Sequence, residues 1–190
     1  MQNVGDDKAA LAYQRNAKLS GLPTGLKDLD AKMGGLQPSD LIIIAGRPGM
    51  GKTSLATNIA FSVARAYQAP REGSSSTPEM SGGIVAFFSL EMSTEQLATR
   101  VIAEQSEISS SNIRRGDISE NDFDALLVQR RQEIRLIPLY IDSTGAVTVG
   151  QLAARARRLK RQRGLHLIVV DYFQLMQAQS IVPRRTACAR

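Results

Sequence analysis

A glycine-rich stretch at residues 46–53 constrains the fold of this chain more than any other sequence feature. It contains, in order, Gly46, Arg47, Pro48, Gly49, Met50, Gly51, Lys52 and Thr53. An apolar run at 41–45 precedes the stretch, and residues 53–67 place apolar side chains at helical spacing after it. Glycines permit a tight turn, so the sequence predicts a buried strand, a turn and a helix in direct succession.

Three further short apolar runs lie at 84–89, 138–142 and 167–171. Like the run at 41–45, they are continuously apolar and do not alternate with polar residues. This pattern is typical of strands that are buried on both faces of a parallel sheet. Because helical segments are predicted between the runs, we expect an α/β fold in which helices flank a mostly parallel sheet.

Three of the expected helices begin with a sequence pattern typical of helix N-termini. A Ser or Thr is followed three positions later by a Gln or Asp, in the pairs Ser93 with Gln96, Ser119 with Asp122, and Thr148 with Gln151. The expected helices cover residues 93–105, 119–135 and 148–164. A shorter polar helix is predicted at 7–18.

Composition excludes several classes of protein. The chain has 190 residues, enough for one domain with a sizeable core. No apolar run approaches the roughly 18 residues of a membrane-spanning helix, and the N-terminus lacks a secretory pattern, so we expect a cytoplasmic location without a membrane partner. A single cysteine, Cys188, and a single histidine, His166, exclude a Cys/His zinc cluster. The net charge of +6 is compatible with a polyanionic partner, although it is modest.

The glycine-rich stretch has the spacing of a P-loop, in which backbone N–H groups and a helix N-terminus surround the phosphates of a nucleotide. Lys52 is expected to reach the β- and γ-phosphates, and the Thr53 hydroxyl to ligate Mg²⁺. The predicted nucleotide-binding residues are Gly46, Arg47, Pro48, Gly49, Met50, Gly51, Lys52, Thr53 and Ser54. Kinases, transporters, GTPases and motors share this motif, so it leaves the reaction open.

Two carboxylates are expected near the phosphates. Asp171 ends the apolar run at 167–171, which is the arrangement of a Walker B acid that holds Mg²⁺ directly or through water. Glu91 lies just beyond the run at 84–89, where a carboxylate could orient and deprotonate an attacking water. The residues alone equally allow Glu91 to be a charge that stabilises a helix N-terminus.

Several motifs in a fixed order resemble the DnaB-type replicative DNA helicases. They are the segments at 21–30 and 34–36, the P-loop, the segment at 88–93 and the segment at 169–176. The resemblance covers about residues 20–177. It implies a RecA-like P-loop NTPase core, with Lys52 and Thr53 as the phosphate and magnesium residues, Asp171 as the Walker B acid and Glu91 as the catalytic base.

The resemblance also implies a function and partners. Proteins of this family bind ATP and Mg²⁺, form homo-hexamers around single-stranded DNA and unwind duplex DNA at the replication fork in the 5′ to 3′ direction. Primase and a helicase loader are the family's protein partners. This chain begins too late to contain the family's N-terminal primase-binding domain, so primase recruitment is not expected of it.

The same comparison divides the chain into three segments. Residues 1–19 are interpreted as a linker or docking helix, residues 20–177 as a partial RecA-like ATPase domain, and residues 178–190 as an atypical tail. The strands, the γ-phosphate-sensing glutamine and the arginine finger that follow in the family do not appear. We therefore expect an incomplete ATPase core that hydrolyses ATP poorly alone, with a tail that arises from out-of-frame coding.

Two other interpretations fit the residues. One is a related RecA-like ATPase of recombination or signalling, and the other is a non-catalytic nucleotide-binding fragment. The predicted helix at 148–164 also carries six basic residues, Arg155, Arg157, Arg158, Lys160, Arg161 and Arg163. These side chains could contact DNA phosphates or a neighbouring subunit, or they could form a solvated helix face whose cations suit the helix dipole.

Overall fold

A computed structural model describes residues 19–69, 82–120 and 136–177. The elements in these ranges are α2 (Lys27–Met33), α3 (Lys52–Arg65), β1 (Val85–Ser89), α4 (Thr94–Ser106), α5 (Ser110–Arg115), β2 (Leu139–Asp142), α7 (Val149–Arg163), β3 (Leu167–Asp171) and the short 3₁₀ helix η2 (Phe173–Leu175). The predicted strands at 84–89, 138–142 and 167–171 are therefore confirmed.

The three strands form a parallel sheet in the order β2-β1-β3. In its register, Ser89 at the end of β1 lies opposite Asp171 at the end of β3. All five residues of the central strand β1 are buried. The side chains of β2 and β3 are mostly half-buried because each strand is an edge of the sheet that the described residues form.

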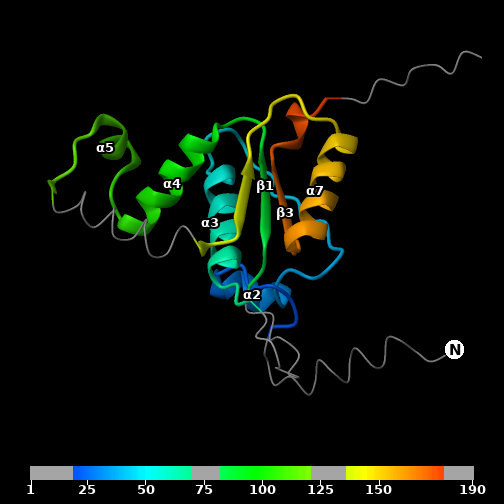
Figure 1. The fold of residues 1–190 in the computed structure, drawn as a ribbon. Coiled ribbons are helices and arrows are strands. Elements are labelled where there is room, and N and C mark those ends of the chain that lie inside the picture. Colours follow the sequence, from blue (N-terminus) through cyan, green and yellow to red (C-terminus); the bar gives the residue numbers. More distant parts are fainter. Residues whose placement is uncertain (1–18, 70–81, 121–135, 178–190) are drawn as a thin grey trace, which may run out of the picture.

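Helices cover both faces of this sheet, as expected of the α/β class. Figure 1 shows α3 and α4 on one side of the strands and α7 on the other. The apolar side of α3 packs on β1 and meets Leu22 and Leu97. The buried cluster at this interface comprises Leu22, Ile59, Ala60, Val63, Ala64, Val85, Phe87 and Leu97. No helix in the described ranges has both the length and the hydrophobicity needed to span a bilayer.

The predicted helix starts at Ser93 and Thr148 are confirmed with the geometry of a capping box. The Ser93 hydroxyl accepts a hydrogen bond from the Gln96 N–H, and the Gln96 side chain accepts one from the Ser93 N–H. Thr148 and Gln151 make the same pair of contacts at the start of α7. Each box satisfies two of the backbone donors that a helix N-terminus leaves without partners.

The predicted strand at 41–45 is wrong. These residues pair with no strand, and the side chains of Leu41 and Ile43 are 86% and 71% exposed. Apolarity alone does not make a strand, because a strand also needs a neighbour that pairs with its backbone. The described residues offer none: β1 is paired on both sides, and the open edge of β3 makes no bridge to this segment.

Helices α2 and α5 were not predicted from the sequence. Both are short, with seven and six residues, so neither shows a full apolar period. Helix α2 is held by the buried carboxylate of Asp30, which accepts hydrogen bonds from the Thr24 N–H and hydroxyl, both at 2.8 Å. The predicted helix at 7–18, most of the one at 119–135 and the tail at 178–190 lie outside the described residues.

Candidate functional site

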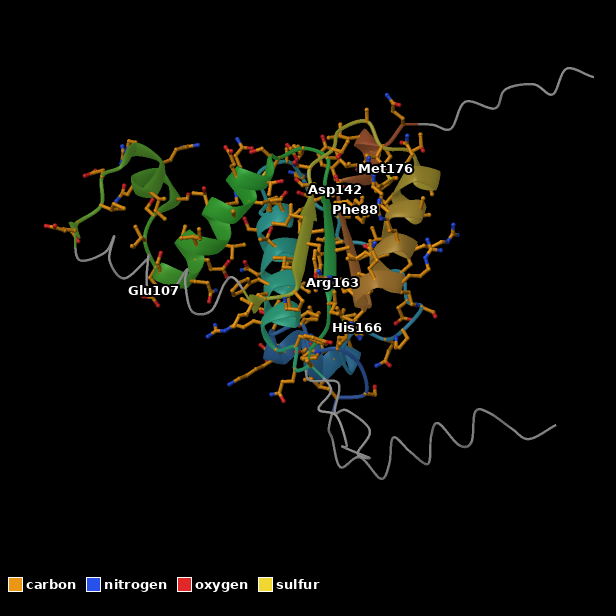
Figure 2. The ribbon with its side chains drawn as sticks, in the orientation of Figure 1. Phe88, Glu107, Asp142, Arg163, His166 and Met176 are labelled. Atoms are coloured by element: carbon orange, nitrogen blue, oxygen red, sulfur yellow. The ribbon has the colours of Figure 1, made fainter. Side chains whose placement is uncertain are left out.

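The carboxyl ends of the parallel strands meet at one end of the molecule. Figure 2 places Phe88 of β1, Asp142 of β2 and Met176 at this end, and His166, which precedes β3, at the other. In parallel α/β sheets, ligands bind outside the carboxyl ends of the strands. The glycine-rich turn reaches the same end, since Thr53 directly after it contacts Asp171 at the end of β3.

The turn at 46–51 has the backbone of an open loop that leads into α3. Gly49 and Gly51 have φ angles of 78° and 80°, in the left-handed region that favours glycine. A Cβ atom at either position would meet nothing within 4 Å. The backbone conformation therefore accounts for these two glycines, and the space above the loop is open.

Lys52 begins α3 and bends back over the turn. Its ammonium group donates hydrogen bonds to the carbonyl oxygens of Gly46 at 2.9 Å and Arg47 at 3.0 Å. The helix N-terminus below it exposes backbone N–H groups and the positive end of the helix dipole. A cation and a set of free donors at one point form an environment suited to phosphate oxygens.

Thr53 and Asp171 are 118 residues apart in the sequence and are in contact in the structure. The Thr53 hydroxyl donates a hydrogen bond of 3.2 Å to Oδ1 of Asp171. Asp171 is only 6% exposed, and its Oδ2 atom has no partner in the described part of the chain. A buried carboxylate oxygen without a donor is costly unless a ligand satisfies it. The pair of hydroxyl and carboxylate oxygens fits a hard cation such as Mg²⁺.

Glu91 lies two residues beyond Ser89, the partner of Asp171 in the sheet register. Its side chain is exposed and makes no hydrogen bond or ion pair with the described residues. The backbone beside it is fixed to β3, because the Leu90 N–H donates a hydrogen bond of 2.7 Å to the carbonyl oxygen of Asp171. Glu91 is therefore placed at the same end of the sheet as the Thr53–Asp171 pair.

The remaining predicted site residues surround this pair less closely. Lys52 and Thr53 are half-buried, whereas the other predicted residues of the loop are exposed, namely Gly46, Arg47, Pro48, Gly49, Met50, Gly51 and Ser54. The large apolar side chain of Met50 is 73% exposed. The structure thus brings Lys52, Thr53 and Asp171 to one place, and leaves Arg47, Met50 and Ser54 without a described contact through their side chains.

A family model described as the C-terminal domain of DnaB-like helicases matches residues 21–189. The chain belongs to this family. The resemblance to DnaB-type helicases that the sequence motifs predicted is therefore confirmed.

Curated relatives agree with the family. The chain is 40% identical over 171 residues to the replicative DNA helicase DnaB of Rickettsia bellii, covering 89% of this chain and 33% of the relative. It is 38% identical over 171 residues to DnaB of Geobacillus stearothermophilus, covering 90% and 34%. The chain thus spans about a third of the length of these DnaB relatives.

Two solved structures share the fold of this DnaB-like domain. One is a DnaB-like replicative helicase studied with primase, with a TM-score of 0.74 and 23% identity over 95% of this chain and 42% of that one. The other is described as an ATPase domain, with a TM-score of 0.72 and 23% identity over 95% of this chain and 61% of that one. They confirm the predicted RecA-like α/β fold class.

Sequence reasoning missed two contacts of the DnaB-like domain near the site. Arg155, which the sequence allows as a DNA or subunit contact or as part of a solvated helix face, donates to Oδ2 of Asp142 at 2.6 Å. Ser89, the last residue of β1, makes two hydrogen bonds with the backbone of Met92. Each contact joins residues from a strand end and a following turn or helix, and no periodic pattern marks such a pair.

Proposed function

We propose that this chain is the nucleotide-binding and ATP-hydrolysing core of a replicative DNA helicase. The observation that carries the proposal is the Thr53–Asp171 contact beside Lys52, at the carboxyl end of the sheet in a chain of the DnaB-like family. It brings together a phosphate-binding cation, a hydroxyl and a buried carboxylate with one free oxygen. Those are the groups that hold a nucleotide and its metal ion in P-loop NTPases.

In this proposal, the loop residues 46–54 bind ATP, and Lys52 turns from its two backbone carbonyls toward the β- and γ-phosphates. Thr53 and Oδ2 of Asp171 would hold Mg²⁺, which when bound neutralises charge on the phosphates. Glu91 accepts a proton from the attacking water through its carboxylate. Its exposed side chain, free of described partners, is available for that role.

The proposal extends to partners and place of action. The relatives reported above are named replicative DNA helicases, and one structural neighbour is described together with primase. By analogy we propose a homo-hexamer that encloses single-stranded DNA, unwinds duplex DNA 5′ to 3′ and acts in the cytoplasm with a helicase loader. These names favour replication over the recombination or signalling alternatives.

Thermal unfolding with and without Mg²⁺ and a non-hydrolysable ATP analogue tests the nucleotide site. At a ligand concentration about 100 times the dissociation constant, binding adds about 2.7 kcal/mol to the free energy of unfolding. For a domain of this size, the melting temperature should rise by about 5 to 10 °C. Lys52→Ala should abolish the rise, because it removes the phosphate-binding cation. An equal rise in the variant would contradict the assignment of the site.

A phosphate-release assay distinguishes an ATP-hydrolysing enzyme from a non-catalytic nucleotide-binding fragment. With protein in excess over labelled ATP, the parent chain should release phosphate in a single turnover. Glu91→Gln should keep the analogue-induced rise in melting temperature and slow phosphate release by about 10²- to 10⁴-fold, as expected for the loss of a general base. Nucleotide binding without any phosphate release by the parent chain would favour the fragment.

A further inference from the structure

Ser89 has a polar side chain in the most buried strand of the protein. It is the last residue of β1, it is 1% exposed, and it lies opposite Asp171 in the register with β3. Four hydrophobic residues precede it in the strand, namely Val85, Ala86, Phe87 and Phe88. A buried hydroxyl is costly unless both its donor and its acceptor capacity find partners.

The Ser89 hydroxyl uses both its donor and its acceptor capacity on the backbone of one residue, Met92. The Ser89 hydroxyl donates to the carbonyl oxygen of Met92 at 2.7 Å and accepts from the N–H of Met92 at 3.2 Å. The two bonds close the segment 89–92 into a turn, with Leu90 and Glu91 between the joined residues. Helix α4 does not need these bonds, because Ser93 caps its first turn through Gln96.

The other side of the turn is tied to β3. The Leu90 N–H donates to the carbonyl oxygen of Asp171 at 2.7 Å. Glu91 thus lies between two anchored residues. The backbone of Leu90 is bonded to Asp171, and the backbone of Met92 is bonded to the Ser89 hydroxyl. Since the Glu91 side chain makes no described contact of its own, its position depends on the backbone that these anchors fix.

We propose that Ser89 is a positioning residue for the hydrolysis reaction, which holds the Glu91 carboxylate at a fixed place beside Asp171. The inference rests on the proposed function, in which Glu91 accepts the proton of the attacking water. A hydroxyl that acts through Glu91 changes the rate of the chemical step and leaves nucleotide binding alone, because the described side-chain hydrogen bonds of Lys52, Thr53 and Asp171 do not involve the turn.

The first test measures the anchor itself. Amide hydrogen exchange of the 190-residue chain should show a protected Met92 amide, and Ser89→Ala should remove that protection because the acceptor is gone. The amides of β1, from Val85 to Phe88, should exchange as in the parent chain. Unchanged protection of Met92 in the variant would overturn the proposal, whatever the hydrolysis rate.

The second test measures steady-state ATP hydrolysis. Ser89→Ala should lower kcat by about ten- to a hundredfold with KM for ATP unchanged, because a misplaced base slows chemistry without weakening binding. Ser109→Ala is the matched control: Ser109 also holds a backbone N–H, that of Ser111, but at the start of α5. It should leave both constants at the parent values.

A double-mutant cycle decides whether Ser89 acts through Glu91. In the Glu91→Gln background, Ser89→Ala should have little further effect on the rate, since the group that it positions is already removed. Equal effects in both backgrounds would overturn the positioning role and leave the proposed function intact. Parent-like hydrolysis by Glu91→Gln alone would instead refute the catalytic role of Glu91, and the inference would fall with it.

Discussion

The two carboxylate oxygens of Asp171 have different surroundings. Oδ1 accepts a hydrogen bond from the Thr53 hydroxyl, whereas the buried Oδ2 has no partner in the described residues. Leaving one buried acceptor without a donor costs about 1–3 kcal/mol in the ligand-free protein. A cation that binds at Oδ2 removes this cost, so the site is less favourable when empty than when filled.

Asp171→Asn tests whether a cation binds at Oδ2 of Asp171. The amide removes the negative charge, so the magnesium-dependent part of the nucleotide-induced rise in melting temperature should disappear. The ligand-free variant should melt no lower than the parent, because a neutral amide is less costly to bury than an unpaired carboxylate oxygen. Asp28→Asn on the exposed start of α2 is the control, and it should keep the full rise with Mg²⁺. If the rise in melting temperature of Asp171→Asn depended on Mg²⁺ as in the parent, Asp171 would not be a metal ligand.

Among the helices and strands, local patterns predicted most elements correctly, but the apolar run at 41–45 forms no strand because it has no pairing neighbour. The capping residues Ser93 and Thr148 fix the starts of α4 and α7, and the apolar runs of β1, β2 and β3 fix three strands. Thr53 and Asp171 were each expected to hold Mg²⁺, and the structure brings them into contact although the strand expected at 41–45 does not form. Contacts such as Ser89 with Met92 were missed because a single turn has no period.

The ion pair between Asp142 and Arg155 joins the end of β2 to α7, and its strength depends on pH. Burial pushes the pKa of Asp142 upward, but hydrogen bonds from Thr144 and the Arg155 guanidinium outweigh this effect and hold the pKa below its usual value. A lowered pKa in the folded state stabilises the protein above the unfolded value of about 3.9. That stabilisation is lost as the pH falls through the folded pKa.

Asp142→Asn should therefore lower the urea midpoint at pH 7 and have a smaller effect at a pH below the lowered folded pKa of Asp142, where the carboxylate of the parent is protonated in both states. The expected loss at pH 7 is modest, since Arg155 and Asp142 keep 39% and 29% of their side-chain surface exposed. Urea unfolding curves at both pH values measure it. A loss of equal size at the two pH values would show that the charge of Asp142 is not what stabilises the α7 contact.

In the molecule as a whole, the sheet that the described residues form has open edges, and the same residues include an exposed apolar segment. Strand β3 pairs only with β1 among the described strands, and Leu41, Ile42, Ile43 and Ile44 are 40% to 86% exposed. The turn that follows this segment is joined to β3 through the contact between Thr53 and Asp171. Unpaired strand edges and exposed apolar segments promote association between chains.

Ile43→Lys tests whether this segment drives association. Ile43 is 71% exposed, so the lysine should add charge without opening a cavity, and the melting temperature should stay close to that of the parent. Sedimentation velocity over rising protein concentration should show self-association of the parent chain and less of it in the variant. Val149→Lys is the matched control, because Val149 is 65% exposed and belongs to a different element, the start of α7. Equal association of Ile43→Lys and the parent, or equal relief by Val149→Lys, would mean that the chains associate through another surface or through charge alone.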